Sequence, residues 1–297
     1  MLQPTETSYF SPPAAGLDPR LFRAGKLDGS VRSAILQLLQ NHLNRHYIGA
    51  EGWHEAWLAG SGVSFQWAAN REPGDLDCLV GINFARFRES NNSLRGLSDQ
   101  DIADLMNEKL RDELHPETEN FLGTFELTFF VIVSPSILNI KPYAAYSLTN
   151  DEWVVTPVPE SAVANPTWDK AVEADRSRTL TLLTNYIAAK NKFESANNEA
   201  LKANARSELR VAASQGINLY NEIHGNRSAA FAPSGQGYSD FNNYRWQANK
   251  KSGVIHALRG IRSEMEAQDT AELQKRYGVS EFPDTRTLIR RAATYNQ

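Results

Sequence analysis

The apolar positions in the first part of the chain predict a helix followed by strands that alternate with helical segments. After a cap at Asp28, Gly29 and Ser30, apolar residues recur at helical spacing, at Val31, Ile35, Leu38, Leu39 and Leu43. Short apolar runs then predict strands at about 55–60, 76–82 and 124–133, and a hairpin at about 141–157. A helix is predicted over 98–115. Strands interleaved with helices indicate a small mixed sheet with helices packed on it.

The second part of the chain shows only helical patterns. Prolines in 157–168 mark a linker, and long helices are predicted over 172–193 and 198–223. We therefore expect an α+β protein with two domains. Residues 1–165 would form the small mixed-sheet domain, with an N-terminal arm and helix, and residues 166–297 an α-helical domain.

Composition narrows the class of protein. The chain has 297 residues, of which 41% are hydrophobic and 22% charged, as in globular proteins. A net charge of −4 argues against a surface that binds nucleic acid throughout. The single cysteine, Cys78, excludes a disulfide framework and is expected in the core. With neither a signal-peptide pattern nor a membrane-spanning apolar run, we expect a cytoplasmic protein without a membrane partner.

Two aspartates lie at the start of the second predicted strand. Asp75 and Asp77 follow a turn at Pro73 and Gly74, and side chains two residues apart on a strand point to the same face. Two carboxylates held so close repel each other unless a cation lies between them. Magnesium prefers such oxygen ligands and takes others from water and substrate phosphates. The pair therefore predicts a magnesium site, although Asp-x-Asp after a turn is also common without a function.

Gly60 and Ser61, at the end of the first predicted strand, are candidates for phosphate binding. Glycine lets the backbone approach a ligand closely, and the serine hydroxyl is a donor. The residues after them, 63–69, predict a short helix. The N-terminus of such a helix would present free amide groups to phosphate oxygens.

Together these motifs resemble the signature of the DNA polymerase β-like nucleotidyltransferase superfamily, and in particular predicted nucleotidyltransferases of bacteria and phages. The resemblance is carried by Ala59-Gly60-Ser61, the spacer 62–74 and Asp75-Leu76-Asp77-Cys78, and it covers residues 50–135. It implies a third carboxylate on a neighbouring strand. Glu126 is the only acid in 123–133, which is expected to be a half-covered central strand, although the family usually has aspartate there. Asp151 and Glu152 are the alternative.

The resemblance implies a transferase that moves a nucleoside monophosphate from a nucleoside triphosphate, ATP among them, to an acceptor hydroxyl and releases pyrophosphate. Asp75, Asp77 and Glu126 would be catalytic and would bind two Mg²⁺ ions, with Mn²⁺ as an alternative. Gly60 and Ser61 would bind the β- and γ-phosphates. The acceptor is left open: the acidic net charge favours a small molecule or a protein over a long nucleic acid, and basic residues at 245–262 keep a tRNA possible.

Those basic residues lie on one side of an amphipathic pattern in 241–265. At helical spacing one side holds Arg245, Lys251, His256, Arg259 and Arg262, and the other Trp246, Val254, Ala257, Leu258 and Ile261. A solvated helix face is the simplest interpretation. Because two-lobed nucleotidyltransferases often carry such residues on a helical second lobe, the resemblance implies that Arg245, Lys250 and Lys251 bind the nucleotide. Gly253 is expected to interrupt the helix.

Three further interpretations stay open. His42 and His46 share a helix face and resemble half of a zinc site, but no third ligand is evident from the sequence, and a solvated pair is favoured. The glutamate in place of the usual aspartate favours an inactive nucleotide-binding or regulatory module on the same fold. A helical scaffold protein, in which Asp-x-Asp is incidental, is the third.

Overall fold

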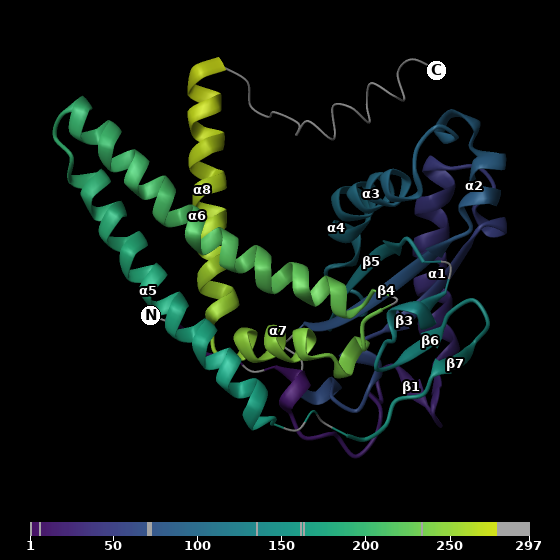
Figure 1. Ribbon diagram of the computed structural model, residues 1–297. Helices are drawn as coiled ribbons and strands as arrows, with labels where there is room; N and C mark the ends of the chain where they lie inside the picture. Colours follow the sequence, from purple (N-terminus) through teal and green to yellow (C-terminus); the bar gives the residue numbers. More distant parts are fainter. Residues whose placement is uncertain are drawn as a thin grey trace. The chain divides into compact units, whose positions relative to one another are not determined.

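The computed structural model describes residues 2–5, 7–69, 73–134, 136–160, 162, 164–232 and 234–277. Their contacts form two compact units (Figure 1). The sheet unit is Ser8–Ala162, and the helical unit comprises the described residues of Met1–Thr7 and Val163–Pro283. The fold is α+β, as the sequence predicts. Among the helices in these ranges, none combines the length and apolar character needed to cross a lipid bilayer.

The sheet unit contains a five-stranded mixed sheet in the order β5-β4-β3-β6-β7. The strands are β3 (His54–Ala59), β4 (Gly74–Ile82), β5 (Phe125–Ile132), β6 (Ala145–Ser147) and β7 (Glu152–Val155). Among the pairings of these five strands, that of β4 with β5 is parallel and the others are antiparallel. The expectation that β5 is a central strand is wrong, because β5 lies at the edge. The sequence of β5 has the apolar character of a central strand because Phe130, on its less buried face, is an exposed aromatic residue.

The core of this unit lies between one face of the sheet and three helices. These are α1 (Gly29–His46), α2 (Phe84–Ser90) and α3 (Asp99–Lys109). The α1 helix begins at the predicted cap, where Asp28 Oδ1 accepts a hydrogen bond from the Ser30 backbone nitrogen at 2.9 Å. Cys78 is fully buried in this core, as expected, and burial raises the pKa of its thiol. Two short strands, β1 (Phe22–Arg23) and β2 (Lys26–Leu27), precede α1.

The helix predicted over 98–115 is not regular throughout. After α3 the chain makes a π-helical turn, Leu110–Leu114, and continues as the short helix α4 (His115–Thr118). A π-helical turn holds more residues than an α-helical turn, so the side chains after it point in directions that a regular helix would not give them. The turn contacts α1, and Leu110 and Leu114 are buried in the same core.

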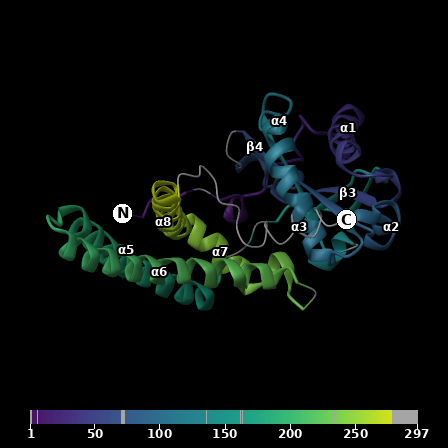
Figure 2. The same ribbon diagram turned by 90° about the horizontal axis from the view of Figure 1, so that it is seen from above.

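The helical unit is built from α5 (Pro166–Ser195), α6 (Glu199–Ala230), α7 (Phe241–Lys251) and α8 (Val254–Tyr277). Both views show α5 and α6 side by side (Figures 1 and 2). Apolar residues from α6, α7 and α8 form a common core, among them Leu219, Ile223, Trp246 and Leu258. The interruption expected at Gly253 is confirmed, since it separates α7 from α8 with φ +82°.

Candidate functional site

The pairing of β4 with β5 brings the predicted carboxylates to one face of the sheet. Asp75 is in register with Glu126, and Asp77 with Thr128. The residues between them, such as Leu76 and Leu127, point into the core, so these four side chains lie on the opposite face. The carboxylates therefore occupy neighbouring positions at the start of two adjacent strands.

The predicted phosphate-binding segment lies directly against these aspartates. Ala59 ends β3 opposite Asp77, and Gly60 follows with φ +85°. A Cβ atom on Gly60 would lie 3.1 Å from Asp77 Oδ2, and one on Gly62 would lie 2.5 Å from the Asp75 carbonyl oxygen. Only glycine fits at these two positions without a shift of the strand or of the carboxylate. The two sequence motifs therefore lie next to each other in the fold.

The short helix expected over 63–69 is wrong in kind and extent. The structure has two 3₁₀ turns instead, Ser61–Val63 and Trp67–Ala69. The Ser64 hydroxyl explains the break, because it bonds locally to Ser61 O at 2.9 Å and to Gln66 Oε1 at 2.7 Å. A three-residue turn does not supply the dipole of a long helix. Phosphate binding here would depend on loop amides and the Ser61 hydroxyl.

Each of two carboxylates has a partner that the sequence did not indicate. The Thr128 hydroxyl donates to Asp77 Oδ1 at 3.2 Å. Glu126 Oε1 lies 3.3 Å from His115 Nε2, and the Glu126 side chain is 22% exposed. His115 occupies the first position of α4, and no motif marked it as a site residue. The third carboxylate is therefore part of a histidine–glutamate pair.

The oxygen donors of the predicted site suit Mg²⁺ or Mn²⁺ in kind. Asp75, Asp77 and Glu126 share a face, but within the described ranges the group of three potential ligands that converges is His42, His46 and Glu113, whose ligand atoms lie within 4.8 Å of one another. Glu126 also has His115 as a neighbour at 3.3 Å. Two-metal binding by the three carboxylates stays a prediction.

The alternative third carboxylates are far from this site in the sheet. Asp151 and Glu152 lie at the β6–β7 hairpin, and β7 is the edge opposite β5. Asp151 Oδ1 accepts a hydrogen bond from the Tyr146 hydroxyl at 2.8 Å. These residues therefore cannot replace Glu126, and the alternative is wrong.

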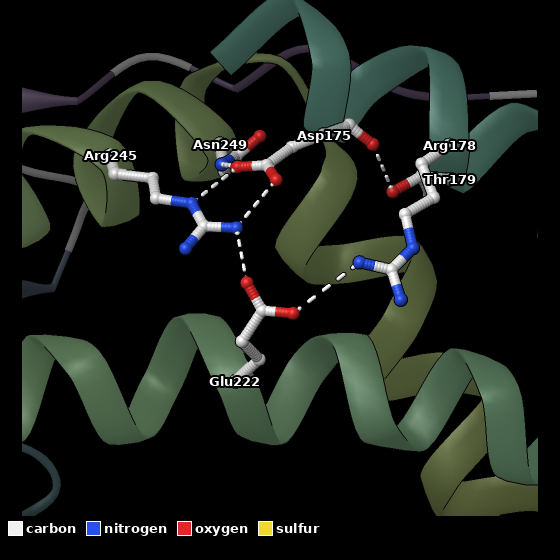
Figure 3. A network of polar contacts seen from close by, with 6 residues as sticks. All are labelled: Asp175, Arg178, Thr179, Glu222, Arg245 and Asn249. Atoms are coloured by element: carbon white, nitrogen blue, oxygen red, sulfur yellow. Dashed lines mark hydrogen bonds and ion pairs between the residues drawn. The ribbon is translucent and has the colours of Figure 1, made fainter. Parts of the chain in front are cut away.

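Arg245 belongs to a network of polar contacts inside the helical unit (Figure 3). Its Nε and Nη2 atoms bond to the Asp175 carboxylate at 2.7 and 2.6 Å, and Nη2 bonds to Glu222 at 2.8 Å. The Asn249 amide also donates to Asp175, at 2.7 Å. The arginine side chain is only 12% exposed. These contacts explain Arg245 as a structural residue, and the prediction that it binds nucleotide gains nothing from them.

Lys250 and Lys251 have exposed side chains at the end of α7. Their backbone carbonyls accept hydrogen bonds from Thr5, at 2.8 Å from its hydroxyl and 2.9 Å from its amide. The backbone of both residues thus has a structural role, while nucleotide binding by their side chains stays a prediction.

The favoured interpretation of His42 and His46 as a solvated pair is wrong. His42 is 1% exposed, and Glu113 from the π-helical turn brings a third potential ligand to the two rings. His46 Nε2 lies 2.6 Å from Glu113 Oε2. Burial, assisted by the nearby His46, lowers the pKa of His42 to about 4, so its ring is neutral at neutral pH. Glu113 is distant in sequence, and only the folded chain brings it to α1.

Comparisons with protein-family models, curated proteins and solved structures find no match for this chain. The likeness to nucleotidyltransferases therefore depends on the residues themselves.

Proposed function

We propose that the sheet unit is a metal-dependent nucleotidyltransferase domain, which transfers a nucleoside monophosphate from a nucleoside triphosphate to an acceptor hydroxyl. One observation carries the proposal: the Gly60–Ser61 segment lies against Asp75 and Asp77, and Glu126 is in register with Asp75 on the next strand. A phosphate-binding loop beside grouped carboxylates is the arrangement that phosphoryl-transfer chemistry requires.

Each residue has a distinct role in this proposal. Asp75 and Asp77 would hold Mg²⁺, which supplies charge neutralisation at the phosphates and lowers the pKa of the acceptor hydroxyl. Gly60 leaves room for the phosphates, and Ser61 donates a hydrogen bond to them. Glu126 would accept the acceptor proton, with His115 holding the carboxylate in position at 3.3 Å.

The charge of the chain bears on the acceptor. The net charge of −4 favours a small molecule or a protein as acceptor, with an RNA such as tRNA as the alternative. A nucleoside triphosphate is the donor in each case, and the residues described do not select a base.

A second candidate function is a nucleotide-binding module without turnover. The pairing of His115 with Glu126 favours it, because the imidazole nitrogen 3.3 Å from Glu126 Oε1 occupies the oxygen that would otherwise bind a metal ion or accept a proton. In this module the Gly60–Ser61 segment would still bind phosphate, and the protein would report the presence of nucleotide to a partner.

The decisive experiment incubates the full chain with each α-labelled nucleoside triphosphate and Mg²⁺ or Mn²⁺, with and without cell extract. Label transfer and pyrophosphate are measured for the wild type, Asp77→Asn and the control Asp104→Asn, which changes an aspartate on α3. We expect Asp77→Asn to lower transfer at least about 100-fold, since metal binding supplies several kcal/mol. The control should transfer normally.

Two other outcomes would contradict the proposed transferase activity. Nucleotide binding without transfer under every condition would favour the module. Nucleotide binding that is absent, or unchanged in an Asp75→Asn, Asp77→Asn double variant, would exclude both functions for this site.

A further inference from the structure

A second group of potential metal ligands lies on the helical side of the sheet unit. His42 and His46 are one turn apart on α1, and their ring centroids are 4.8 Å apart. Glu113, from the π-helical turn Leu110–Leu114, completes the group. One ligand atom from each of the three residues lies within 4.8 Å of the others. The fold itself brings α1 and the π-helical turn together, so the three potential ligands are already close to one another without an ion.

The burial of His42 is the second observation that indicates a ligand. The residue is 1% exposed, and within the described ranges neither ring nitrogen has a hydrogen-bond partner. A buried polar group without a partner is unfavourable, because it has given up its hydrogen bonds to water. Hydrophobic packing alone would be served better by leucine at this position. A metal ion that binds the lone pair of one ring nitrogen would remove the part of this cost that belongs to that nitrogen.

Each carboxylate oxygen of Glu113 lies close to a nitrogen atom of another side chain. Its Oε1 lies 3.5 Å from Lys109 Nζ, and its Oε2 lies 2.6 Å from His46 Nε2. The lysine contact helps to fix the direction of the carboxylate, and Oε2 faces the imidazole of His46. Second contacts of this kind orient the ligands in many metal sites.

We propose that His42, His46 and Glu113 bind one divalent transition-metal ion, with Zn²⁺ favoured. Two imidazoles and one carboxylate are a common donor set for zinc, with water in the fourth position. Imidazole donors also discriminate against Mg²⁺, which prefers oxygen. The site is separate from the proposed transferase residues and does not depend on them.

The proposed ion would join two segments that are far apart in sequence. It would link the last turn of α1 to the π-helical turn, and so would hold both segments in the geometry that the fold shows. Zinc binding is therefore expected to raise the melting temperature of the full chain, because an ion that binds only the folded state stabilises it.

Titration of the metal-free full chain, produced without a histidine tag, tests the proposal. We expect one equivalent of Zn²⁺ to bind in calorimetry, with retention confirmed by elemental analysis. His46→Gln and Glu113→Gln should each weaken binding at least about 100-fold, since even outer-shell partners contribute 10- to 100-fold. Both residues are partly exposed, with side chains 19% and 42% accessible, so the variants are expected to fold.

Matched controls separate this site from the rest of the chain. His256→Gln, at an exposed position on α8, and Glu117→Gln, on α4, should bind zinc as the wild type does. Asp77→Asn should also bind normally, so failure of the proposed transferase would not affect this result. Co²⁺ should give visible absorption bands that the His46 variant loses. Absence of zinc binding, or equal affinity in all variants, would overturn the proposal.

Discussion

Asp175 shows how single residues stabilise the helical unit. Its carboxylate, which is buried, accepts hydrogen bonds from Arg245 and Asn249, and its backbone carbonyl accepts one from the Thr179 hydroxyl at 2.8 Å (Figure 3). The hydrogen bonds from Arg245 to Asp175 raise the pKa of the arginine and keep it charged despite its burial. One residue of α5 thus joins two residues of α7.

Asp175→Asn is expected to lower the free energy of unfolding of the helical unit by about 3 kcal/mol. The substitution leaves the buried Arg245 without its main counter-charge while the shape of the side chain changes little. Urea denaturation followed by circular dichroism measures the effect. Arg178→Gln is the control, because the exposed Arg178–Glu222 pair, at 3.4 Å, contributes at most about 1 kcal/mol. Equal small effects would show that the network is not a stabilising centre.

Sequence reasoning at this scale succeeded where local periodicity was sufficient. The two-residue period of a strand placed Asp75 and Asp77 on one face and Cys78 on the other. It could not find His115 as the partner of Glu126, or Glu113 as the neighbour of His46, because strand and helix packing create these contacts between segments. The periodicity of apolar residues describes a single helix or strand. It does not show which other element packs against that helix or strand.

At the scale of elements, the break between α7 and α8 is the clearest agreement between sequence and structure. The amphipathic pattern of 241–265 predicts a helix, and the glycine within it predicts an interruption. A Cβ atom on Gly253 would lie 2.3 Å from the backbone oxygen of Gln3, so the position excludes side chains for two reasons, the positive φ and the contact.

Gly253→Ala is therefore expected to destabilise the helical unit by at least about 2 kcal/mol, from left-handed strain and the clash with Gln3. Gly260→Ala is the matched substitution within α8, where a Cβ atom would meet nothing within 4 Å. It should stabilise the protein by up to about 1 kcal/mol, because alanine favours the helix. Thermal melting of both variants measures the difference. A Gly253→Ala variant as stable as Gly260→Ala would contradict the expectation.

The elements that the sequence missed have physical causes of their own. An apolar strand with one exposed aromatic residue has the pattern of a central strand, so β5 was misplaced. Side-chain hydrogen bonds of Ser64 divide 63–69 into two turns, and propensity does not report such local competition. The spacing of apolar residues does not reveal the π-helical turn, because the same residues could also continue a regular α-helix.

At the scale of the whole molecule, the N-terminal residues connect to elements far along the chain. Residues 2–5 and 7 belong by their contacts to the helical unit, and Leu2 packs against its core. Thr5 donates hydrogen bonds to the carbonyls of Lys250 and Lys251 at the end of α7. A segment without periodicity cannot be assigned to a unit from its sequence.

A chain shortened to begin at residue 8 is expected to lose about 2 kcal/mol of stability in the helical unit, from two hydrogen bonds and the packing of Leu2. Hydrogen exchange detected by mass spectrometry measures the effect for each unit. Amides of α7 should exchange faster, and those of β4 should be unchanged. Equal acceleration in both units, or none, would contradict the expectation.

Because of the π-helical turn, the number of residues between α3 and α4 determines where the side chains after it point. Glu113, within the turn, contacts His46 of α1, and His115, directly after the turn, contacts Glu126 of β5. Loss of a single residue from the part of the turn before Glu113 would restore a regular helix and rotate everything beyond it by about 100°. Both neighbourhoods would then lose a partner at once, although every side chain named here would still be present.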